Sequence, residues 1–439
     1  MKLASSLRWH LNVTVLGSAW LKWDRLRLAR KLRRPWRHPH LGPPLLTSPR
    51  LKELISRHYL RGRFANDRYP VAWVTSGAPV EVLVALGYFV IYPENHGAVC
   101  GIREVGDTMA AHAEAAGYSP DLCSYARADI GAALSGETPV GRLPRPDLLL
   151  CCTNICQTVL YWYRVLAEHF GCPLVVIDTP FVYDQASEHA VTYVERQIED
   201  SVAVCERVAG RALDSRRLQR VTSRSKEAVA LWGSVLQCGM ARPTPITAFD
   251  AFIHMAPIVE MRGEELTVAY YRALLAELRR RVDRGIGAVK GERHRVLWDN
   301  LPIWHRLRWL GELLAEHQVA MVASTYTNAW GELAELIDPA RPIASAARCY
   351  IHPILNRGTG HKLATMRRMV GEYGVDGVIL HSDRSCKPYS IGQVDQRSRL
   401  AGEAGVPALL LEADHNDPRS FSEQQATTRL QAFLEMLAA

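Results

Sequence analysis

The amino-acid sequence predicts an α/β protein built from two doubly wound, Rossmann- or flavodoxin-like parallel-sheet domains. Short apolar runs of strand length alternate with helical patterns in two separate series along the chain. Such alternation is typical of parallel sheets whose two faces are covered by helices. The length of 439 residues is more than one small core organises, which favours two units.

Changes in composition and pattern divide the chain into four segments. Residues 1–50 form a basic N-terminal arm that ends in the proline-containing linker HPHLGPPLLTSPR. Residues 51–214 are expected to be a first α/β domain and residues 215–292 a helical connector with charged faces. Residues 293–439 then form the second α/β domain.

The predicted elements of the first domain alternate in type. Strands are short apolar runs that close on small or polar residues, and they are expected at 71–75, 88–92, 147–152 and 173–178. Helices are expected where apolar residues recur every three or four positions, at 51–65, 79–86, 157–170 and 186–212.

The second domain repeats this alternation. Its predicted strands are 295–298, 319–324, 377–381 and 407–412, and its closing helices are 390–404 and 422–437. Sheets of this class bind ligands in the crevice beyond the carboxyl ends of their strands. Side chains that directly follow a predicted strand are therefore the first candidates for a site.

Charge and composition narrow the class of protein. No apolar run approaches the roughly eighteen residues that a membrane span requires, and no cleavage site follows the first apolar stretch. Ten cysteines without paired spacing suit a reducing cytoplasm, so we expect a cytoplasmic protein.

The basic N-terminal arm holds the whole formal net charge of +8. Up to Trp36 it has nine basic residues and one acid, Asp24. Such an arm can contact anionic lipid, nucleic acid or an acidic partner, or form a solvated, partly helical tail. No aromatic and basic nucleic-acid module accompanies it, so we expect no nucleic-acid partner.

Three cysteines stand where apolar runs give way to polar residues: Cys123 in LCSYAR, Cys156 in CCTNICQT and Cys386 in DRSCKPYS. If the fold brings these separated thiols together, a soft metal centre is the simplest explanation, and three sulfurs on an iron–sulfur cluster leave one iron open. The alternative is that each is a buried thiol acting as a small hydrophobic side chain.

Several motifs in order resemble the 2-hydroxyacyl-CoA dehydratase and benzoyl-CoA reductase family. They are WVTSGAPVEVLVALGYFVIYPENHGAVCG, LCSYAR, CCTNICQTVLYWY, VIDTPF, and SCKPYSIGQVDQRSRL with LEADHND. The resemblance covers roughly residues 50–439 and looks closest to a large catalytic subunit of benzoyl-CoA reductase.

The resemblance implies one [4Fe-4S] cluster held by three cysteines. Carried over by motif, the ligands are Cys123, Cys156 and Cys386, with Cys100 as the rival of Cys123. Arg384 and Lys387 flank the last ligand, where they would offset cluster charge or serve as ordinary surface charges.

The same resemblance places Ser76, Glu94 and His96 in a substrate pocket. Ser76 would hold a water or hydroxyl at the open iron, and Glu94 would move protons, as a carboxylate in a dry pocket can. The structural alternatives are a helix cap for Ser76, a surface or capping carboxylate for Glu94 and a hydrogen-bonded structural histidine. The segment 356–362, NRGTGHK, would cradle a CoA phosphate or form a plain capped turn.

The expected function is that of a catalytic iron–sulfur subunit in an ATP-driven benzoyl-CoA reductase-type complex. It would reduce an aromatic acyl-CoA by low-potential single electrons. A dehydratase subunit acting through a ketyl radical and a non-catalytic relay subunit are the alternatives. Because the chain has no nucleotide-triphosphate motif, ATP would act through a separate iron–sulfur ATPase activator. A homologous sister subunit would share the site.

Overall fold

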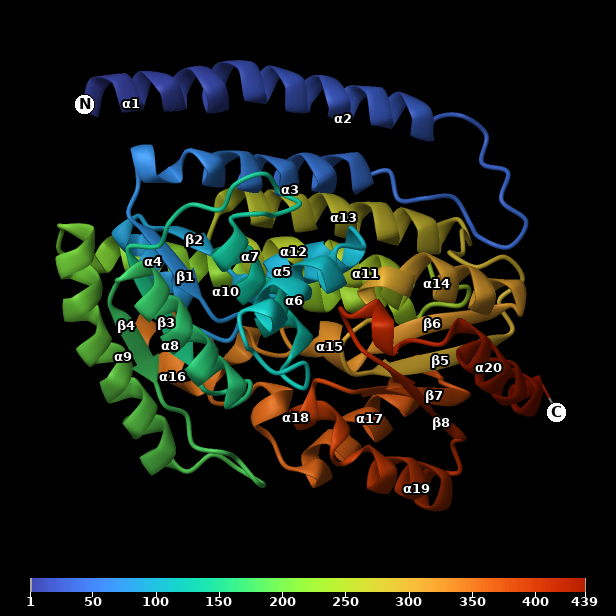
Figure 1. Ribbon diagram of the computed structural model, residues 1–439. Helices are drawn as coiled ribbons and strands as arrows, with labels where there is room; N and C mark the ends of the chain where they lie inside the picture. The colour runs from blue at the N-terminus through green and yellow to red at the C-terminus, as the bar shows by residue number, and fades with distance from the viewer. Residues whose placement is uncertain (1, 439) are drawn as a thin grey trace.

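A computed structural model describes residues 2–438, and their strands form two parallel sheets among many helices (Figure 1). The first sheet has the order β2-β1-β3-β4. Its strands are β1 (Val71–Val74), β2 (Phe89–Ile91), β3 (Leu148–Cys152) and β4 (Leu174–Ile177). All three pairings in this sheet are parallel, and β1 and β3 are buried throughout.

The second sheet repeats the arrangement with the order β6-β5-β7-β8. Its strands are β5 (His294–Asp299), β6 (Val319–Ser324), β7 (Gly377–Asp383) and β8 (Ala408–Ala413). All pairings are again parallel. The prediction of an α/β fold with two doubly wound units is therefore confirmed. In each sheet the strand order reverses beside the first strand, between β1 and β3 and between β5 and β7, and such a point is where this fold binds ligands.

The helices of the first unit pack on the sheet and beside it (Figure 1). They are α4 (Val80–Leu86), α5 (Pro93–Ile102), α6 (Gly106–Ala115), α7 (Ser124–Ser135), α8 (Thr158–Phe170) and α9 (Glu188–Ala209). The sequence pattern did not predict α5, α6 and α7, because small residues such as Gly97, Gly101 and Gly131 interrupt their apolar periodicity.

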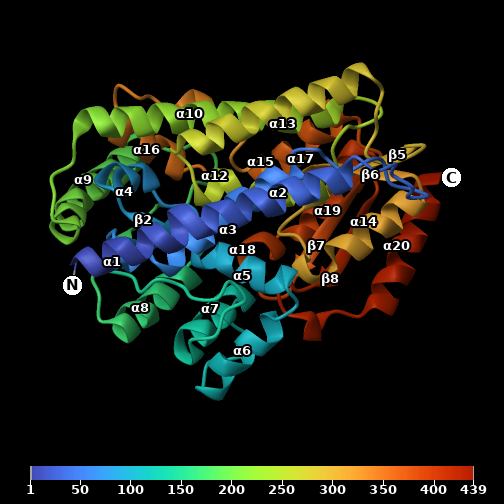
Figure 2. The same cartoon turned by 90° about the horizontal axis from the view of Figure 1, so that it is seen from above.

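The segment between the two units is helical. It contains α10 (Ser215–Gln237), α11 (Ala248–His254), α12 (Ala256–Glu260) and α13 (Glu265–Asp283). Asp214 caps α10 by accepting a hydrogen bond from the Arg217 amide, and a capping box of Thr247 and Asp250 starts α11. The long helices α10 and α13 lie side by side (Figure 2).

The second unit carries α14 (Leu307–Glu316), α15 (Thr325–Asn328), α16 (Pro342–Tyr350), α17 (Thr359–Tyr373), α18 (Lys387–Ser390), α19 (Gln393–Ala404) and α20 (Glu423–Ala438). α16 packs against α9 of the first unit. The two units are therefore joined by direct helix packing as well as by the connector.

The N-terminal arm is a long helical rod rather than a tail standing free in solvent. It consists of α1 (Lys2–Trp9), a π-helical stretch (His10–Gly17) and α2 (Ser18–Leu32), and α2 packs along α3 (Ser48–Arg63). The rod lies across the outside of the molecule with α3 beneath it (Figure 1). Gly17 permits the close approach, because a Cβ there would collide with the Leu60 side chain.

The helices of the described chain give no candidate for a membrane span. Within residues 2–438, none is both long enough and apolar enough to cross a bilayer.

Candidate functional site

A cavity of about 140 Å³ lies between the two units, at the carboxyl ends of their central strands. Its lining includes five residues singled out from the sequence: Ser76, Glu94, Cys123, Cys156 and Cys386. Ser76 follows β1 and Cys156 follows β3, while Cys386 follows β7 of the other sheet. The points at which the strand order reverses in the two sheets thus contribute to one cavity.

Each of the three cysteines stands at or just before the start of a helix. Cys123 is the N-cap residue of α7 and Cys386 that of α18, and Cys156 comes shortly before α8 begins at Thr158. The backbone amides at a helix start face outward and carry partial positive charge, which favours negatively charged groups. The local chain folding therefore suits thiolates at all three positions.

The thiols are close enough to influence one another's ionisation. Burial raises the pKa of Cys156 to about 12, with the neighbouring Cys123 adding to the shift. Burial also raises the pKa of Cys386 well above its usual value, with further contributions from Asp383, Cys123 and Cys156. Three thiolates in one cavity would repel one another, so a stable thiolate set here requires a cation to share.

A fourth cysteine, Cys349, also lines the cavity. Burial raises its pKa to about 12, and the charged groups that act on it are Glu81 and Arg262 rather than the other cysteines. Cys151 and Cys152 are fully buried within β3, as expected for a strand interior.

Ser76 and Glu94 are hydrogen-bonded to each other at the cavity. The Ser76 amide donates to Glu94 Oε1 at 3.0 Å, and the Tyr163 hydroxyl donates to Oε2 at 3.4 Å. Burial raises the pKa of Glu94 to about 7 despite these hydrogen bonds. A carboxyl group with this pKa can both give and take a proton near neutral pH.

The structure does not bring His96 or Cys100 to the cavity. His96 is fully buried, contacts Asp129 at 3.4 Å and hydrogen-bonds the Thr138 hydroxyl at 2.8 Å. The Cys100 thiol lies 3.7 Å from the His96 ring nitrogen Nε2. Both residues belong to α5, and their side chains are buried in the protein interior. Of the two rival cysteines, therefore, only Cys123 lines the cavity.

The basic residues beside Cys386 face away from the cavity. Arg384 and Lys387 are exposed and absent from its lining. Lys387 donates to the Arg384 carbonyl at 2.6 Å, and Arg384 lies 3.6 Å from Glu412. Segment 356–362 forms the turn into α17, where buried Asn356 donates to the carbonyls of Pro180 and Ile351.

A charged network behind Cys123 was not predicted from the sequence. His415 Nδ1 lies 2.7 Å from Asp383, and Nε2 lies 3.0 Å from the Ser124 hydroxyl and 4.0 Å from the Cys123 sulfur. Burial opposes protonation, but Asp383 and Asp414 hold the pKa of His415 well above its usual value. The oxygen and nitrogen atoms of Asp383, Asp414 and His415 lie within 4.8 Å of one another, as metal ligands do, but both ring nitrogens already have protein partners.

Aromatic side chains, also missed in the sequence, form much of the cavity wall. They are Tyr125, Trp162, Tyr326, Trp330, Tyr350 and Tyr389. The sequence could have indicated the charged network, because Asp383 ends β7 and Asp414 follows β8. Both therefore lie at the carboxyl edge of the sheet, where ligands bind. No comparable signal marks the aromatic residues, because they come from separate helices and, for Trp330, from the turn after α15, which only the tertiary fold brings together.

The fold and the cavity define an α/β protein with a thiol-lined site between two doubly wound units. Residues 75–437 match the family model described as "2-hydroxyglutaryl-CoA dehydratase, D-component". The chain belongs to this family.

Characterised relatives match over most of the chain. The chain is similar to the (R)-phenyllactyl-CoA dehydratase alpha subunit of Clostridium sporogenes, at 31% identity over 89% of this chain and 97% of the relative. It is also similar to the (R)-2-hydroxyisocaproyl-CoA dehydratase alpha subunit of Clostridioides difficile, at 31% identity over 88% and 95%. A benzoyl-CoA reductase subunit of Thauera aromatica is 28% identical over 88% and 93%.

Proposed function

We propose that the chain is the catalytic alpha-type subunit of an ATP-driven dehydratase that removes water from a 2-hydroxyacyl-CoA. The observation that carries this proposal is the convergence of Cys123, Cys156 and Cys386 on the cavity that also holds Ser76 and Glu94. Relatives at 31% identity that are named dehydratase alpha subunits support it.

The donor set fits a [4Fe-4S] cluster. Three thiols at the starts of α7, α8 and α18 surround one mostly apolar cavity, and each stands where helix amides favour a thiolate. We assign Cys123, Cys156 and Cys386 as the ligands. When bound through three sulfurs, such a cluster supplies low-potential electrons and an iron open to a substrate oxygen.

The side chains around the thiols have roles of their own. Glu94, with a pKa of about 7, holds the proton that a leaving hydroxyl needs or accepts one from the substrate. Ser76, bonded to Glu94 through its amide, presents its hydroxyl to the same space. Aromatic residues such as Tyr326 and Tyr389 exclude water from reactive species.

The second candidate is a member of a benzoyl-CoA reductase-type complex. The aromatic lining of the cavity favours a substrate with an aryl group, and the relative at 28% identity is named as a subunit of such an enzyme. An aryl group suits the first candidate as well, since one dehydratase relative is named for phenyllactyl-CoA. A relay subunit without its own chemistry is the third candidate.

The relatives are named as single subunits of larger enzymes, which supports a multi-subunit assembly. We therefore propose a homologous sister subunit and a separate ATPase that delivers electrons, because this chain has no nucleotide-triphosphate motif.

Iron content after anaerobic purification tests the ligand assignment. Cys386→Ala should lose most of the iron and the electron paramagnetic resonance signal of a reduced cluster. Cys349→Ala and Cys100→Ala are matched controls, because the first lies in the same cavity and the second is the rival ligand. Full iron in Cys386→Ala, or iron loss in Cys100→Ala, would overturn the assignment.

Electron consumption separates the candidates. A dehydratase needs electrons only catalytically, whereas a reductase consumes them in proportion to product. The assembled complex is supplied with a limiting electron donor and either a 2-hydroxyacyl-CoA or benzoyl-CoA. Many turnovers per electron support the dehydratase, while a fixed ratio with benzoyl-CoA supports the reductase. A cluster signal that neither thioester perturbs favours the relay candidate.

A further inference from the structure

The outward face of the N-terminal rod carries a stripe of exposed apolar side chains. The exposed fraction is 50% for Leu11, 58% for Trp23 and 44% for Leu26. Leu7, Val15, Leu16 and Trp20 are the other large apolar residues of this face. Most of them are three or four residues apart, which is the spacing that places side chains on one face of a helix. Exposed apolar patches of this length mark contact surfaces.

The stripe is not needed to hold the rod in place. Trp9, Val13 and Leu21 are buried on the opposite face, and Arg8 pairs with Asp67. Both views show the rod as the outermost layer over α3 (Figures 1 and 2). Nothing in the described part of the chain covers its outer face, which extends for about 45 Å at the usual helical rise.

Basic side chains accompany the second half of the stripe. Lys22, Arg30 and Lys31 are exposed and take part in no ion pair within residues 2–438. Arg27 lies over the Trp23 ring at 5.3 Å. With these three cations beside the apolar stripe, this face combines apolar and cationic chemistry.

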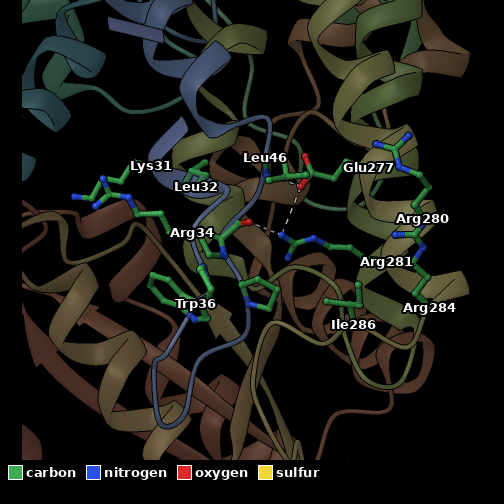
Figure 3. Close-up of a pocket in the computed structure, with 13 residues that line it drawn as sticks. Lys31, Leu32, Arg34, Trp36, Leu46, Glu277, Arg280, Arg281, Arg284 and Ile286 are labelled. Carbon is green, nitrogen blue, oxygen red and sulfur yellow. Dashed lines mark hydrogen bonds and ion pairs between the residues drawn. The ribbon is translucent and has the colours of Figure 1, made fainter. Parts of the chain in front are cut away.

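A cationic pocket of about 410 Å³ opens where the rod ends (Figure 3). Lys31 and Arg34 line one side, and Arg280 and Arg284 line the other from the end of α13. Trp36 and other apolar side chains complete the wall. These side chains add positive charge where the rod meets α13, which suits an anionic surface.

The pocket is fixed in shape by buried contacts. Arg281 pairs with Glu277 at 3.5 Å and donates to the Pro44 carbonyl at 2.6 Å. Glu277 also accepts hydrogen bonds from the amides of Leu46 and Thr47, at 2.5 and 2.8 Å. The linker is thereby tied to α13 next to the end of the rod.

We propose that the outer face of the rod docks on an anionic lipid bilayer. Exposed leucine and tryptophan beside lysine and arginine are the composition of helices that lie in a membrane interface. Anionic headgroups attract basic segments of this kind. The docking does not depend on the chemistry proposed for the cavity.

Other occupants suit this face less well. A second copy of the chain would bring two strongly positive faces together. The rod lies outside residues 75–437, the part that the family model matches, so an interface common to the family has no reason to use it. Nucleic acid would leave the leucine and tryptophan stripe without a partner, because its backbone is bound by basic and polar groups.

Flotation with vesicles tests the proposal on the full chain and on its complex with the sister subunit. Vesicles of phosphatidylcholine alone are compared with an equal mixture of phosphatidylcholine and phosphatidylglycerol, at low and high salt. The wild type should float with the mixed vesicles at low salt, less at high salt, and not with phosphatidylcholine alone.

Two pairs of variants separate the apolar and charged contributions. Trp20→Ser with Trp23→Ser should lower vesicle binding at least about tenfold. Arg30→Gln with Lys31→Gln should lower it about fivefold for each neutralised charge. The control for the tryptophan pair is Tyr161→Ser with Met436→Ser, two apolar residues elsewhere on the surface with exposed fractions of 71% and 54%. The control for the basic pair is Arg216→Gln with Arg220→Gln, two exposed arginines of α10.

The proposal is overturned if the wild type stays in the aqueous fraction with mixed vesicles, or if the tryptophan variant floats as the wild type does. Flotation of the isolated chain but not of its complex would also overturn it, because the face would then belong to a subunit interface. The wild-type lipid and salt dependence decides the matter even if a variant fails to fold.

Discussion

Among the individual residues, Glu94 has the ionisation that proton transfer requires. Its pKa of about 7 results from burial. Glu94→Gln should lower kcat of the assembled complex by about 10²- to 10⁴-fold and remove the change in rate near pH 7. Rate against pH is measured anaerobically. Glu260→Gln is the control, because Glu260 also has a pKa of about 7 but does not line the cavity. An unchanged profile in Glu94→Gln would exclude Glu94 as the proton donor.

Glu260 makes its own contribution to stability. Its carboxyl accepts a hydrogen bond from the Tyr59 hydroxyl at 2.8 Å, and burial raises its pKa from 4.5 to about 7. The folded protein therefore binds this proton more tightly than the unfolded chain, so stability falls as the pH rises from 4.5 to 7. Glu260→Gln should remove up to about 3 kcal/mol of this dependence. Urea unfolding at several pH values measures the free energy of unfolding of the wild type and of Glu260→Gln. If the two free energies change with pH in parallel, the prediction is contradicted.

The sequence was informative for residues that follow strands. Ser76 and Cys156 could be placed at the carboxyl edge of the first sheet and Cys386 at that of the second, because each follows a predicted strand. That the two edges face one cavity was implied only by the family resemblance. His96 belongs to the same motif as Glu94, but on α5 it points into the interior, to Asp129. A sequence motif shows how far apart two residues are along the chain. The direction in which the His96 side chain points depends on α5, which the sequence pattern did not predict.

At the level of elements, the pair α6 and α7 positions Cys123. The helices meet at Gly131, where a Cβ would lie 1.8 Å from the Met109 carbonyl oxygen. Gly131→Ala should therefore lower the free energy of unfolding by about 1–3 kcal/mol or more. Gly371→Ala is the matched control, since Gly371 in α17 has no atom within 4 Å of the added Cβ, and should stabilise by about 0.5–1 kcal/mol. Chemical denaturation compares the two, and equal effects would show that the helices can separate freely.

Elements differed in how well the sequence predicted them. The strands are continuous apolar runs bounded by polar residues, and β6 at Val319–Ser324 has the predicted bounds. The rod at residues 2–32 was not predicted as a packed helix, because large apolar side chains lie on its outer face as well as on its inner face and weaken the amphipathic pattern.

In the whole molecule, a buried ion pair joins the two units. Arg127 in α7 lies 3.0 Å from Asp417, which follows β8. Burial opposes ionisation, but Arg419 and Arg127 hold the pKa of Asp417 below its usual value. Arg127→Leu should lower the free energy of unfolding by about 1.5–3 kcal/mol, because Asp417 loses its buried partner and keeps only its pairing with Arg419 at 2.6 Å.

The double variant Arg127→Leu with Asp417→Asn should recover part of that loss, because the buried carboxylate that lost one of its two partners is then neutral. Urea unfolding of the two single variants and the double variant measures the coupling. If the losses of stability in the two single variants simply add in the double variant, Arg127 and Asp417 are not coupled, and Arg419 alone neutralises Asp417.

The origin of the cavity in both halves has a consequence for how the protein matures. Cys123 and Cys156 belong to the first unit, and Cys386 lies far along the chain in the second. A nascent chain of which only the first half has been synthesised contains two of the three cysteines and cannot complete the group of three. On the proposed ligand assignment, iron insertion waits until synthesis has passed β7 and the halves have closed, so a filled centre would report that both units have folded together.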